Sequence, residues 1–329
     1  MKLRLLITAA TFSVLGFSLA SAQAADDYEA PRTQWGHPDI QGVWNFASNV
    51  PLTRPRQFGD RQYMTEEEAV MLGKAAEAGF EALNEQGVGG YNTFWVEQAG
   101  RGDNLRTSLI TYPENGQFPP TVEGIVVQFG GLGPDFDGQR PVLVPVGGIG
   151  KDGPEDRGIS ERCIVGFNSG PPFVPSMYNN NVQIVQNNDH VVIMTEMIHD
   201  ARIVPIDGRG HINDEIRQWT GDSRGYWEGD TLVVETRNFN DQTQSFAVFG
   251  DAYDKVLTEK FTRVNDFTVD YEFTIDDPST FTDKITAIVP MTKVAGQLYE
   301  YACHEGNYAM PGILAGARRL EMEEAARNQ

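Results

Sequence analysis

The sequence of 329 residues has little positive charge and no late apolar segment. Lysine and arginine together number 26 against 46 aspartate and glutamate residues, which gives a formal net charge of −20. A surface this acidic repels phosphate backbones and anionic lipids, so it disfavours nucleic acid and membrane surfaces as partners. After residue 24 no apolar stretch is long enough to cross a bilayer, and we expect no membrane insertion.

Several familiar catalytic motifs are missing as well. The sequence has no Gly-x-Ser-x-Gly elbow, no phosphate-binding loop, no dinucleotide fingerprint and no Cys-x-x-Cys pair. These absences disfavour a serine esterase, a nucleotide-dependent enzyme and a redox protein. We therefore predict no organic cofactor.

The N-terminus carries a targeting signal. Lys2 and Arg4 precede an apolar stretch over residues 5–20, and small-x-small cleavage sites follow before residue 25. This arrangement is typical of a secretory signal peptide, and the apolar stretch is short for a membrane span. We predict a signal peptide over residues 1–24 and a mature protein in the periplasm or outside the cell.

The two cysteines, Cys163 and Cys303, bear on the domain organisation. In an oxidising compartment such a distant pair predicts one disulfide, with two free buried thiols as the alternative. A disulfide would tie the middle of the chain to its C-terminal end, which favours a single β-rich domain over residues 25–329. Within it, glycine and proline are concentrated at 130–158, which predicts a long surface loop that is either a lid or an insertion.

Helix signals are few. Thr65 and Glu68 form a capping box that predicts a helix start, and we expect this helix to end near residues 87–90. One apolar stripe follows the box at helical spacing: Leu72, Ala76, Phe80 and Leu83. A weaker helix is expected to start at Thr121, and a last one covers residues 313–326.

Strand signals dominate the second half of the chain. Residues 267–275 alternate apolar and polar, with Phe267, Val269, Tyr271, Phe273 and Ile275 on the apolar face. A strand at 256–264 precedes them, and residues 225–239 form two strands around a turn at 228–230. Further strands are predicted at 180–186, 190–198, 202–206, 284–291 and 297–305. The series predicts a mainly β fold, an antiparallel barrel or a sandwich with a few peripheral helices.

The segment "HDARIVPIDGRGH" at 199–211 holds two of the five histidines. If residues 194–206 form one strand, its period of two places His199 with Met197 and Ile203 on an apolar face and Arg202 on the opposite face. His211 lies just beyond the following turn, free to fold back. A buried histidine with one hydrogen-bond partner would also explain this pattern.

These residues lead to a catalytic hypothesis. Imidazole exchanges protons near neutral pH, so we predict His199 as the general acid or base and His304 as the second one. Asp222 or Glu228 would orient the imidazole. Alternatively, His199, His211 and His304 could together hold a divalent metal ion, although no tight histidine pair is present.

Substrate contacts are expected from cations and aromatic rings near these histidines. Arg202 or Arg224 would hold an anionic group, with His211 beside it. Flat walls would come from Tyr178, Trp219, Trp227 and Tyr301. The alternatives are surface ion pairs for the arginines and core packing for the rings.

Longer segments carry a resemblance to a known family. They are "ERC" at 161–163, "HDARIVPIDGR" at 199–209, "WTGDSRGYWEGDTLVVET" at 219–236 with "NF" at 238–239, "EKFTRV" at 259–264 and "YEYACHEGNY" at 299–308. Over roughly residues 35–318 the chain resembles a large family of secreted bacterial proteins, a resemblance that implies secretion but brings no mechanism with it. Gly210 departs from the family pattern, in which proline often precedes the histidine. Separately, "GVW" at 42–44 is similar to the Gly-x-Trp that opens lipocalin-type barrels.

Together the residues favour an enzyme that uses side-chain acid/base chemistry of the lyase, isomerase or hydratase type. Its substrate would be a small apolar or aromatic, possibly carboxylated, compound that reaches the periplasm. Two further functions stay open: a lipocalin-like protein that binds a small ligand without catalysis, and a metal-dependent hydrolase or lyase with histidine ligands.

Overall fold

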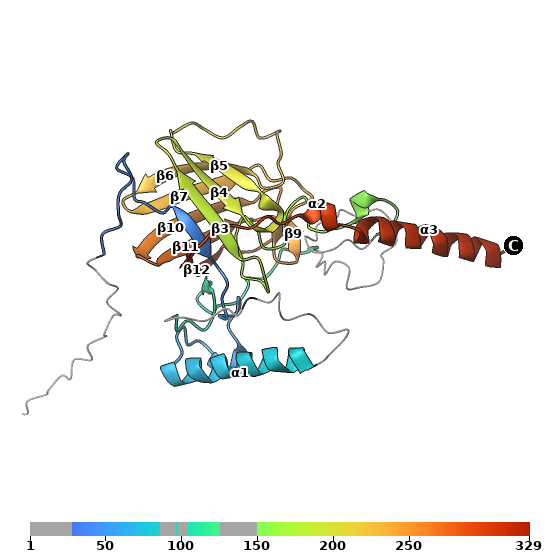
Figure 1. Ribbon diagram of the computed structural model, residues 1–329, viewed down its shortest axis with the longest axis horizontal. Coiled ribbons are helices and arrows are strands. Elements are labelled where there is room, and N and C mark those ends of the chain that lie inside the picture. The colour runs from blue at the N-terminus through green and yellow to red at the C-terminus, as the bar shows by residue number, and fades with distance from the viewer. Residues whose placement is uncertain (1–27, 86–96, 98–103, 126–149) are drawn as a thin grey trace, which may run out of the picture.

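The computed structural model describes residues 28–85, 97, 104–125 and 150–329. The predicted signal peptide at 1–24 and most of the predicted loop at 130–158 lie outside the described residues. The described chain is mainly β, as predicted, with a ten-stranded antiparallel sheet and a separate two-stranded sheet (Figure 1).

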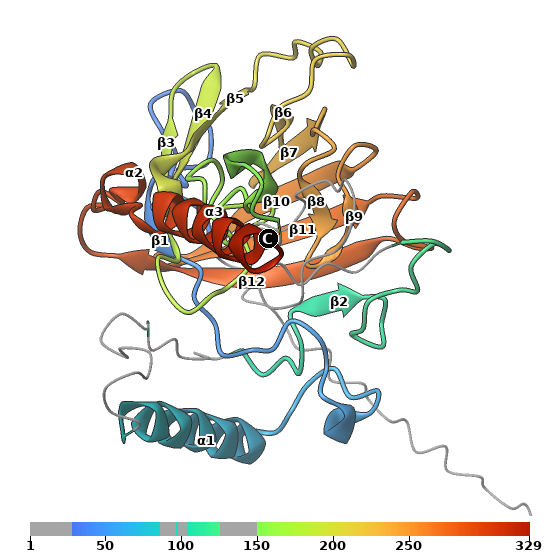
Figure 2. The same ribbon diagram turned by 90° about the vertical axis from the view of Figure 1, so that its right-hand side faces the viewer.

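The ten-stranded sheet runs in the order β5-β4-β3-β1-β12-β11-β10-β7-β6, with β2 added beside β12 (Figure 2). The two-stranded sheet pairs β8 with β9. The strands are β1 Gly42–Asn45, β2 Ile110–Tyr112, β3 Asn181–Gln186, β4 His190–Thr195, β5 Ala201–Pro205, β6 Asp222–Glu228, β7 Thr231–Arg237, β8 Gln244–Phe246, β9 Phe249–Asp251, β10 Val256–Asn265, β11 Thr268–Asp276 and β12 Ile285–Val294.

The large sheet folds over so that its two halves face each other across one core. Arg202 on β5 forms an ion pair with Glu259 on β10, although five strands lie between β5 and β10 in the order of the sheet. At the sheet ends, a Cβ atom added to Gly225 on β6 would lie 2.9 Å from the side chains of Val204 and Ile206. No ladder joins β5 to β6 in the described residues, so of the two predicted architectures the sandwich fits and the closed barrel does not form.

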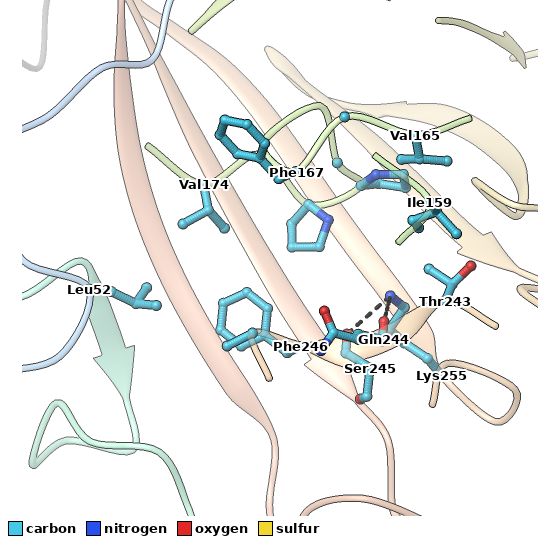
Figure 3. Close-up of a pocket in the computed structure, with 15 residues that line it drawn as sticks. Leu52, Ile159, Val165, Phe167, Val174, Thr243, Gln244, Ser245, Phe246 and Lys255 are labelled. Atoms are coloured by element: carbon cyan, nitrogen blue, oxygen red, sulfur yellow. Dashed lines mark hydrogen bonds between the residues drawn. The ribbon is translucent and has the colours of Figure 1, made fainter. Parts of the chain in front are cut away.

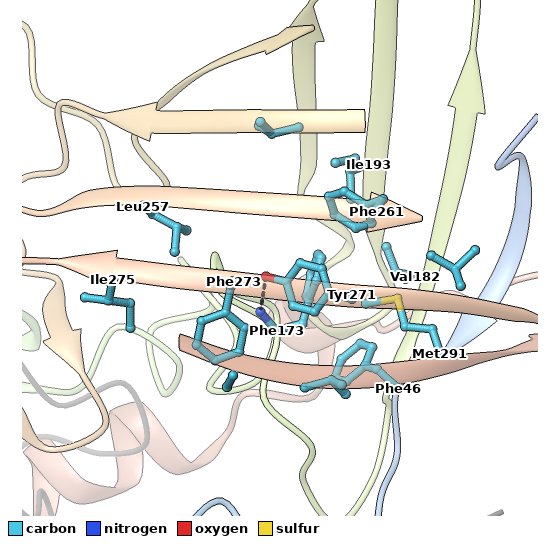
Figure 4. Packing of buried hydrophobic residues seen from close by; sticks show 14 of the residues in the cluster. Phe46, Phe173, Val182, Ile193, Leu257, Phe261, Tyr271, Phe273, Ile275 and Met291 are labelled. Atoms are coloured by element: carbon cyan, nitrogen blue, oxygen red, sulfur yellow. Dashed lines mark hydrogen bonds between the residues drawn. The ribbon is translucent and has the colours of Figure 1, made fainter. Parts of the chain in front are cut away.

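The core follows the predicted alternation of the long strands. On β11 the side chains of Val269, Tyr271, Phe273 and Ile275 are fully buried, which confirms the predicted apolar face (Figure 4). Phe267 is 70% exposed because it lies in the turn before the strand. Burial of such side chains stabilises the fold by about 1.5–3 kcal/mol each.

The main helices lie outside the sheet (Figures 1 and 2). Helix α1, Glu66–Glu85, begins at the predicted capping box, where Thr65 N donates to Glu68 Oε2 at 2.8 Å and Glu68 N donates to Thr65 Oγ1 at 3.2 Å. Helix α3, Ala309–Arg327, confirms the predicted C-terminal helix, and α2, Cys303–Gly306, is a single turn. Short 3-10 helices occur at Arg56–Phe58, Pro154–Asp156 and Met197–His199.

Neither the helix predicted at Thr121 nor a membrane-spanning helix is found in the described residues. The predicted helix at Thr121 does not form over the described residues up to 125, because Thr121 makes a β-bridge with Phe281 instead. Among the described residues, no helix has both the length and the apolar character needed to cross a membrane.

Residues 194–206 do not form one strand, the condition on which the predicted inward position of His199 rested, whereas the two strands predicted at 190–198 and 202–206 correspond to β4 and β5. Strand β4 ends at Thr195, a 3-10 turn follows, and β5 starts at Ala201. Ile198 and His199 have φ values of 64° and 48°, so the chain reverses there and the alternation starts afresh. The inward face of β5 carries Arg202, which is buried. His199 is exposed instead of facing an apolar interior.

The strand predicted at 297–305 is also absent from the structure. Residues 297–302 pair with no strand, and α2 begins at Cys303. The alternation there has no clearly apolar face, so burial gives this segment no reason to join the sheet. It is held by the predicted disulfide between Cys163 and Cys303, whose Cα atoms lie 5.8 Å apart. The disulfide prediction is therefore confirmed.

Candidate functional site

A largely apolar cavity of about 180 Å³ lies between β8 and the segment that precedes β3 (Figure 3). An engineered apolar cavity of about 150 Å³ is known to hold benzene, so this volume suits a compound of one ring or a short chain. The walls are formed by Leu52, Ile159, Val165, Gly166, Phe167, Gly170, Pro171, Pro172, Val174, Thr243, Gln244, Ser245, Phe246, Ala247 and Lys255.

Lys255 places an amine in this wall. It follows the turn after β9 and directly precedes β10, and its side chain is buried. The Nζ atom donates to the backbone oxygens of Gln244 and Ser245, at 3.3 Å and 3.1 Å (Figure 3). The Phe239 ring lies with its centroid 4.1 Å from Nζ. The amine is thus held at a defined position by β8.

Burial changes the acidity of this amine. Removal from water lowers the pKa of the Lys255 ammonium to about 7, against the opposing attraction of Asp277 and Glu259. At neutral pH the free amine and the ammonium are then both present. A group in this range can accept and return a proton during a reaction, as general acid/base catalysis requires.

Two side chains beside Lys255 have unused hydrogen-bonding capacity. Gln244 and Ser245 are 7% and 1% exposed and line the cavity. In the described part of the chain, Nε2 and Oε1 of Gln244 and Oγ of Ser245 have no hydrogen-bond partner. Leaving a buried polar group unsatisfied costs about 1–3 kcal/mol. These atoms are thus unsatisfied polar groups, buried on two residues of the cavity wall next to the Lys255 amine.

The wall formed by the segment around Phe173 is held in place by residues of the core. Phe173 follows the two lining prolines, and its backbone N donates to the hydroxyl of Tyr271 at 3.1 Å (Figure 4). The Arg202 guanidinium lies 5.6 Å from the centre of the Phe173 ring. Tyr271 in turn donates to Glu259 Oε1 at 2.8 Å. A buried polar network thus fixes the segment that lines this side of the cavity.

This network determines the position of Arg202, one of the two arginines predicted to hold a substrate anion. Its Nη1 and Nη2 atoms bind Glu259 Oε2 and Oε1 at 2.6 Å and 2.9 Å. Burial raises the pKa of the Tyr271 hydroxyl well above its usual value, so this group stays protonated and donates. The guanidinium charge of Arg202 is neutralised inside the core by Glu259.

Three of the predicted residues gather around the disulfide, outside the cavity. The exposed His199 ring places Nδ1 3.2 Å from the backbone oxygen of Tyr301. Tyr178 and Tyr301 pack against the small buried cluster that contains Cys163 and Met197. Phe167 contacts this cluster and also lines the cavity, so the two sites share a wall. His304 lies nearby in sequence, exposed on α2.

Asp222, which was predicted to orient His199, contacts His211 instead. Asp222 Oδ2 lies 2.8 Å from Nδ1 of His211, and Glu235 Oε1 lies 3.3 Å from Nε2 of the same ring. Arg224 Nη1 donates to the second oxygen of Asp222 at 2.7 Å. The structure therefore joins Asp222, His211 and Arg224, and it is His211 that Asp222 orients; His199 makes no hydrogen bond to Asp222 in the described residues.

The remaining predicted residues lie on β6 or shortly before it. Glu228 is exposed at the end of β6. Trp227 stacks on His37 with ring centres 5.6 Å apart. Trp219 accepts a hydrogen bond at its backbone oxygen from Thr243, which lines the cavity. Only Trp219 of this set adjoins the cavity wall.

Metal ligation was the second role predicted for three histidines. Within the described residues, no three or more histidine, cysteine, aspartate or glutamate side chains are grouped so that they could hold a metal ion. His199 and His211 bind different partners, one at the disulfide and the other between β6 and β7.

Sequence reasoning missed Lys255, although β10 held a signal. The inward positions of this strand are Leu257, Glu259, Phe261 and Arg263, and the same alternation extends back to Lys255. Three charged residues thus share the face of a long strand with two large apolar ones. The outward face contains two valines, so the pattern did not show which face was buried.

Comparison with known proteins adds no assignment. No protein-family model matches this chain, and a search of curated proteins found no match to it.

Proposed function

We propose that this protein is a secreted or periplasmic enzyme that carries out acid/base chemistry of the lyase, isomerase or hydratase type on a small, largely apolar compound. The reaction centre is the cavity that holds Lys255. The observation that carries the proposal is a buried amine in an apolar wall, next to polar side chains that have no partner among the described residues. The disulfide supports an oxidising compartment.

Lys255 fits the role of the proton-transfer group. Because burial brings the pKa of its ammonium to about 7, the amine removes a proton efficiently at neutral pH and returns it later. The two backbone oxygens of β8 hold Nζ in place, which favours transfer to one position of a bound compound. The largely apolar walls would lower the polarity around a bound compound and so strengthen its polar contacts.

Gln244 and Ser245 would supply these polar contacts. The Gln244 amide offers one donor and one acceptor, and the Ser245 hydroxyl offers either. A substrate with a carbonyl or hydroxyl group would satisfy them, whereas a pure hydrocarbon would leave their desolvation cost in place. The substrate therefore combines an apolar body with a small polar group.

The histidine centre predicted from sequence stays as a second candidate. His211 contacts two carboxylates, Asp222 and Glu235, an arrangement that orients an imidazole for acid/base work. No histidine is among the described residues that line the cavity. Cavity and imidazole would thus act at different places, which makes the two candidates separable by single substitutions.

The experiment compares variants on a broad metabolite extract. Purified protein is incubated with the extract, and mass spectrometry records compounds that are consumed and formed. We expect products with the wild type and with Lys260→Met, a half-exposed lysine on the outer face of β10, and none with Lys255→Met. Loss of products in His199→Ala or His211→Gln, with full activity in Lys255→Met, would move the reaction to a histidine and overturn the proposal.

Two further outcomes address ligand binding without catalysis and metal-dependent chemistry. Retention of one compound without any product would favour a protein that binds a small ligand in the same cavity. Elemental analysis of the active preparation addresses a metal-dependent hydrolase or lyase: stoichiometric metal, with activity lost on chelation and restored by the metal, would favour that enzyme class over catalysis by Lys255.

A further inference from the structure

The Lys255 cavity has features that narrow the class of compound it takes. The inference that follows rests on the proposed function and deepens it. We propose that the cavity binds a small aldehyde or ketone and that Lys255 attaches to its carbonyl carbon as a Schiff base.

The hydrogen bonds of Nζ suit a nucleophilic amine. A neutral amine has two N–H donors and one lone pair, and an ammonium has three donors. In the described residues Nζ finds two acceptors, the backbone oxygens of Gln244 and Ser245. Both N–H groups of the neutral amine are therefore satisfied, and its lone pair is left over. The Phe239 ring favours the charged form, and burial in the apolar wall opposes it.

The neighbouring side chains match the needs of a carbonyl oxygen. When Nζ attacks, the C–N bond forms and the carbonyl π pair moves to oxygen, which needs donors close by. Nε2 of Gln244 and the hydroxyl of Ser245 are donors on two residues that line the cavity, and they find no partner within the described part of the chain. They belong to the two residues whose backbone oxygens hold Nζ. Donors and nucleophile are thus positioned by one short strand, β8.

The chemistry is balanced without any oxidant or reductant. The amine adds to the carbonyl, a proton moves from nitrogen to oxygen, and loss of one water molecule gives the C=N bond. Protonation of that nitrogen draws electrons from the adjacent carbon, so a C–H or C–C bond beside it breaks more easily. Water then adds to the C=N bond, which releases the product carbonyl compound and regenerates Lys255. This sequence provides the lyase or isomerase chemistry of the proposed function.

Size and polarity limit the carbonyl compound. The cavity volume of about 180 Å³ and the surrounding leucine, valine and phenylalanine side chains favour a single ring or a short chain. No arginine is among the described residues that line the cavity, so a dianionic or phosphorylated compound would lack a counter-charge there. We expect an uncharged aldehyde or ketone that carries at most one polar group besides its carbonyl.

Reductive trapping tests this inference. The full mature protein is incubated with benzaldehyde or cyclohexanone, then treated with borohydride, and peptide mass spectrometry locates the reduced adducts. We expect Lys255 to be labelled at least tenfold more than any other lysine, with toluene competing for the cavity and lowering the labelling. Labelling spread evenly over exposed lysines such as Lys260 and Lys284, or unaffected by toluene, would overturn the inference.

Variants give a second measurement. Lys255→Met should lose the dominant adduct, and Ser245→Ala, which keeps the amine, should lower its rate of formation several-fold. The rate in the wild type should rise as pH increases through the range in which the amine loses its proton. A wild-type rate that stays constant between about pH 6 and about pH 8 would contradict the inference even if the lysine variant failed to fold.

The two proposals fail differently. Turnover of an extract compound that depends on Lys255, without an adduct at Lys255 from either probe, would reject the Schiff base and keep acid/base catalysis. A specific adduct at Lys255 without turnover of any extract compound would reject the proposed enzyme and keep a carbonyl-binding site.

Discussion

Arg202 and Glu259 form a two-point ion pair inside the folded sheet. Their nitrogen and oxygen atoms lie 2.6 Å and 2.9 Å apart, and the side chains are 5% and 0% exposed. The pair joins β5 to β10 across the core and shares Glu259 with the hydroxyl of Tyr271. The two halves of the sheet are thus held against each other by an ion pair as well as by apolar packing.

Removal of one partner of this pair should be strongly destabilising. Glu259→Leu leaves the Arg202 charge buried without compensation, so we expect the free energy of unfolding to fall by about 3–5 kcal/mol. Arg202→Met combined with Glu259→Leu should regain most of that loss. Asp276→Ala, which removes a surface ion pair with Lys284, should cost less than about 1 kcal/mol. Urea unfolding followed by circular dichroism measures all of them, and equal losses in the single core and surface variants would contradict the assignment.

The disulfide should contribute measurably to stability. Cys163 and Cys303 are 140 residues apart in sequence, and their link restricts the unfolded chain. Replacement of both by serine should lower the free energy of unfolding by about 2–5 kcal/mol. Wild-type protein in excess reductant provides the control and should match the double variant. If oxidised wild type and the double variant unfold at the same denaturant concentration, the link contributes nothing.

Lys255 should make stability depend on pH in a defined direction. Its pKa is about 7 in the folded protein and near its usual 10.5 in the unfolded chain. Between these values the unfolded chain binds the proton and the folded protein does not, so stability rises with pH over this range. The wild type should gain up to about 1.4 kcal/mol per pH unit relative to Lys255→Met. Below about pH 7 both states are protonated and the difference between the proteins should become constant.

Urea titrations of both proteins from about pH 6 to about pH 9 measure this effect, a range that stays below the titration of the buried Tyr271 hydroxyl. Parallel curves for wild type and Lys255→Met over the whole range would show that the amine is not perturbed by burial.

Alanine substitutions at two glycines with positive φ should distinguish the cost of backbone strain from the cost of steric crowding. Gly250 on β9 has a φ of 55°, and a Cβ atom there would lie 2.6 Å from Cγ2 of Thr280. Gly208 has a φ of 80° and open space around it. Gly250→Ala should therefore reduce the free energy of unfolding by about 1–3 kcal/mol more than Gly208→Ala does. Thermal and urea unfolding measure the difference, and equal effects would mean that Thr280 moves aside without cost.

Local sequence patterns predicted the structure correctly wherever a segment had one clearly apolar face or one clear helix start. The alternation of residues 267–275 predicted the buried side of β11, and the Thr65 capping box predicted where α1 begins, because both depend on near neighbours in sequence. Cys163 and Cys303 were correctly paired, since no other cysteine exists.

Tertiary structure decided the rest. The left-handed turn at Ile198 and His199 reversed the alternation, so that His199 became exposed and Arg202 was buried. Arg202 faces inward because Glu259, distant in sequence, supplies its counter-charge there. Lys255 became a candidate for the same kind of reason: only the folded chain brings β8 and the cavity wall around its amine and removes it from water.

The sequence by itself determined a mainly β chain, its long strands, its two main helices and its disulfide, because these follow from residue type and short-range spacing. The folding of the sheet onto itself determined which charged residues are buried, which of them find partners, and which polar groups are left available beside a cavity. Those properties depend on distances between residues far apart in the chain, and no local pattern contains them.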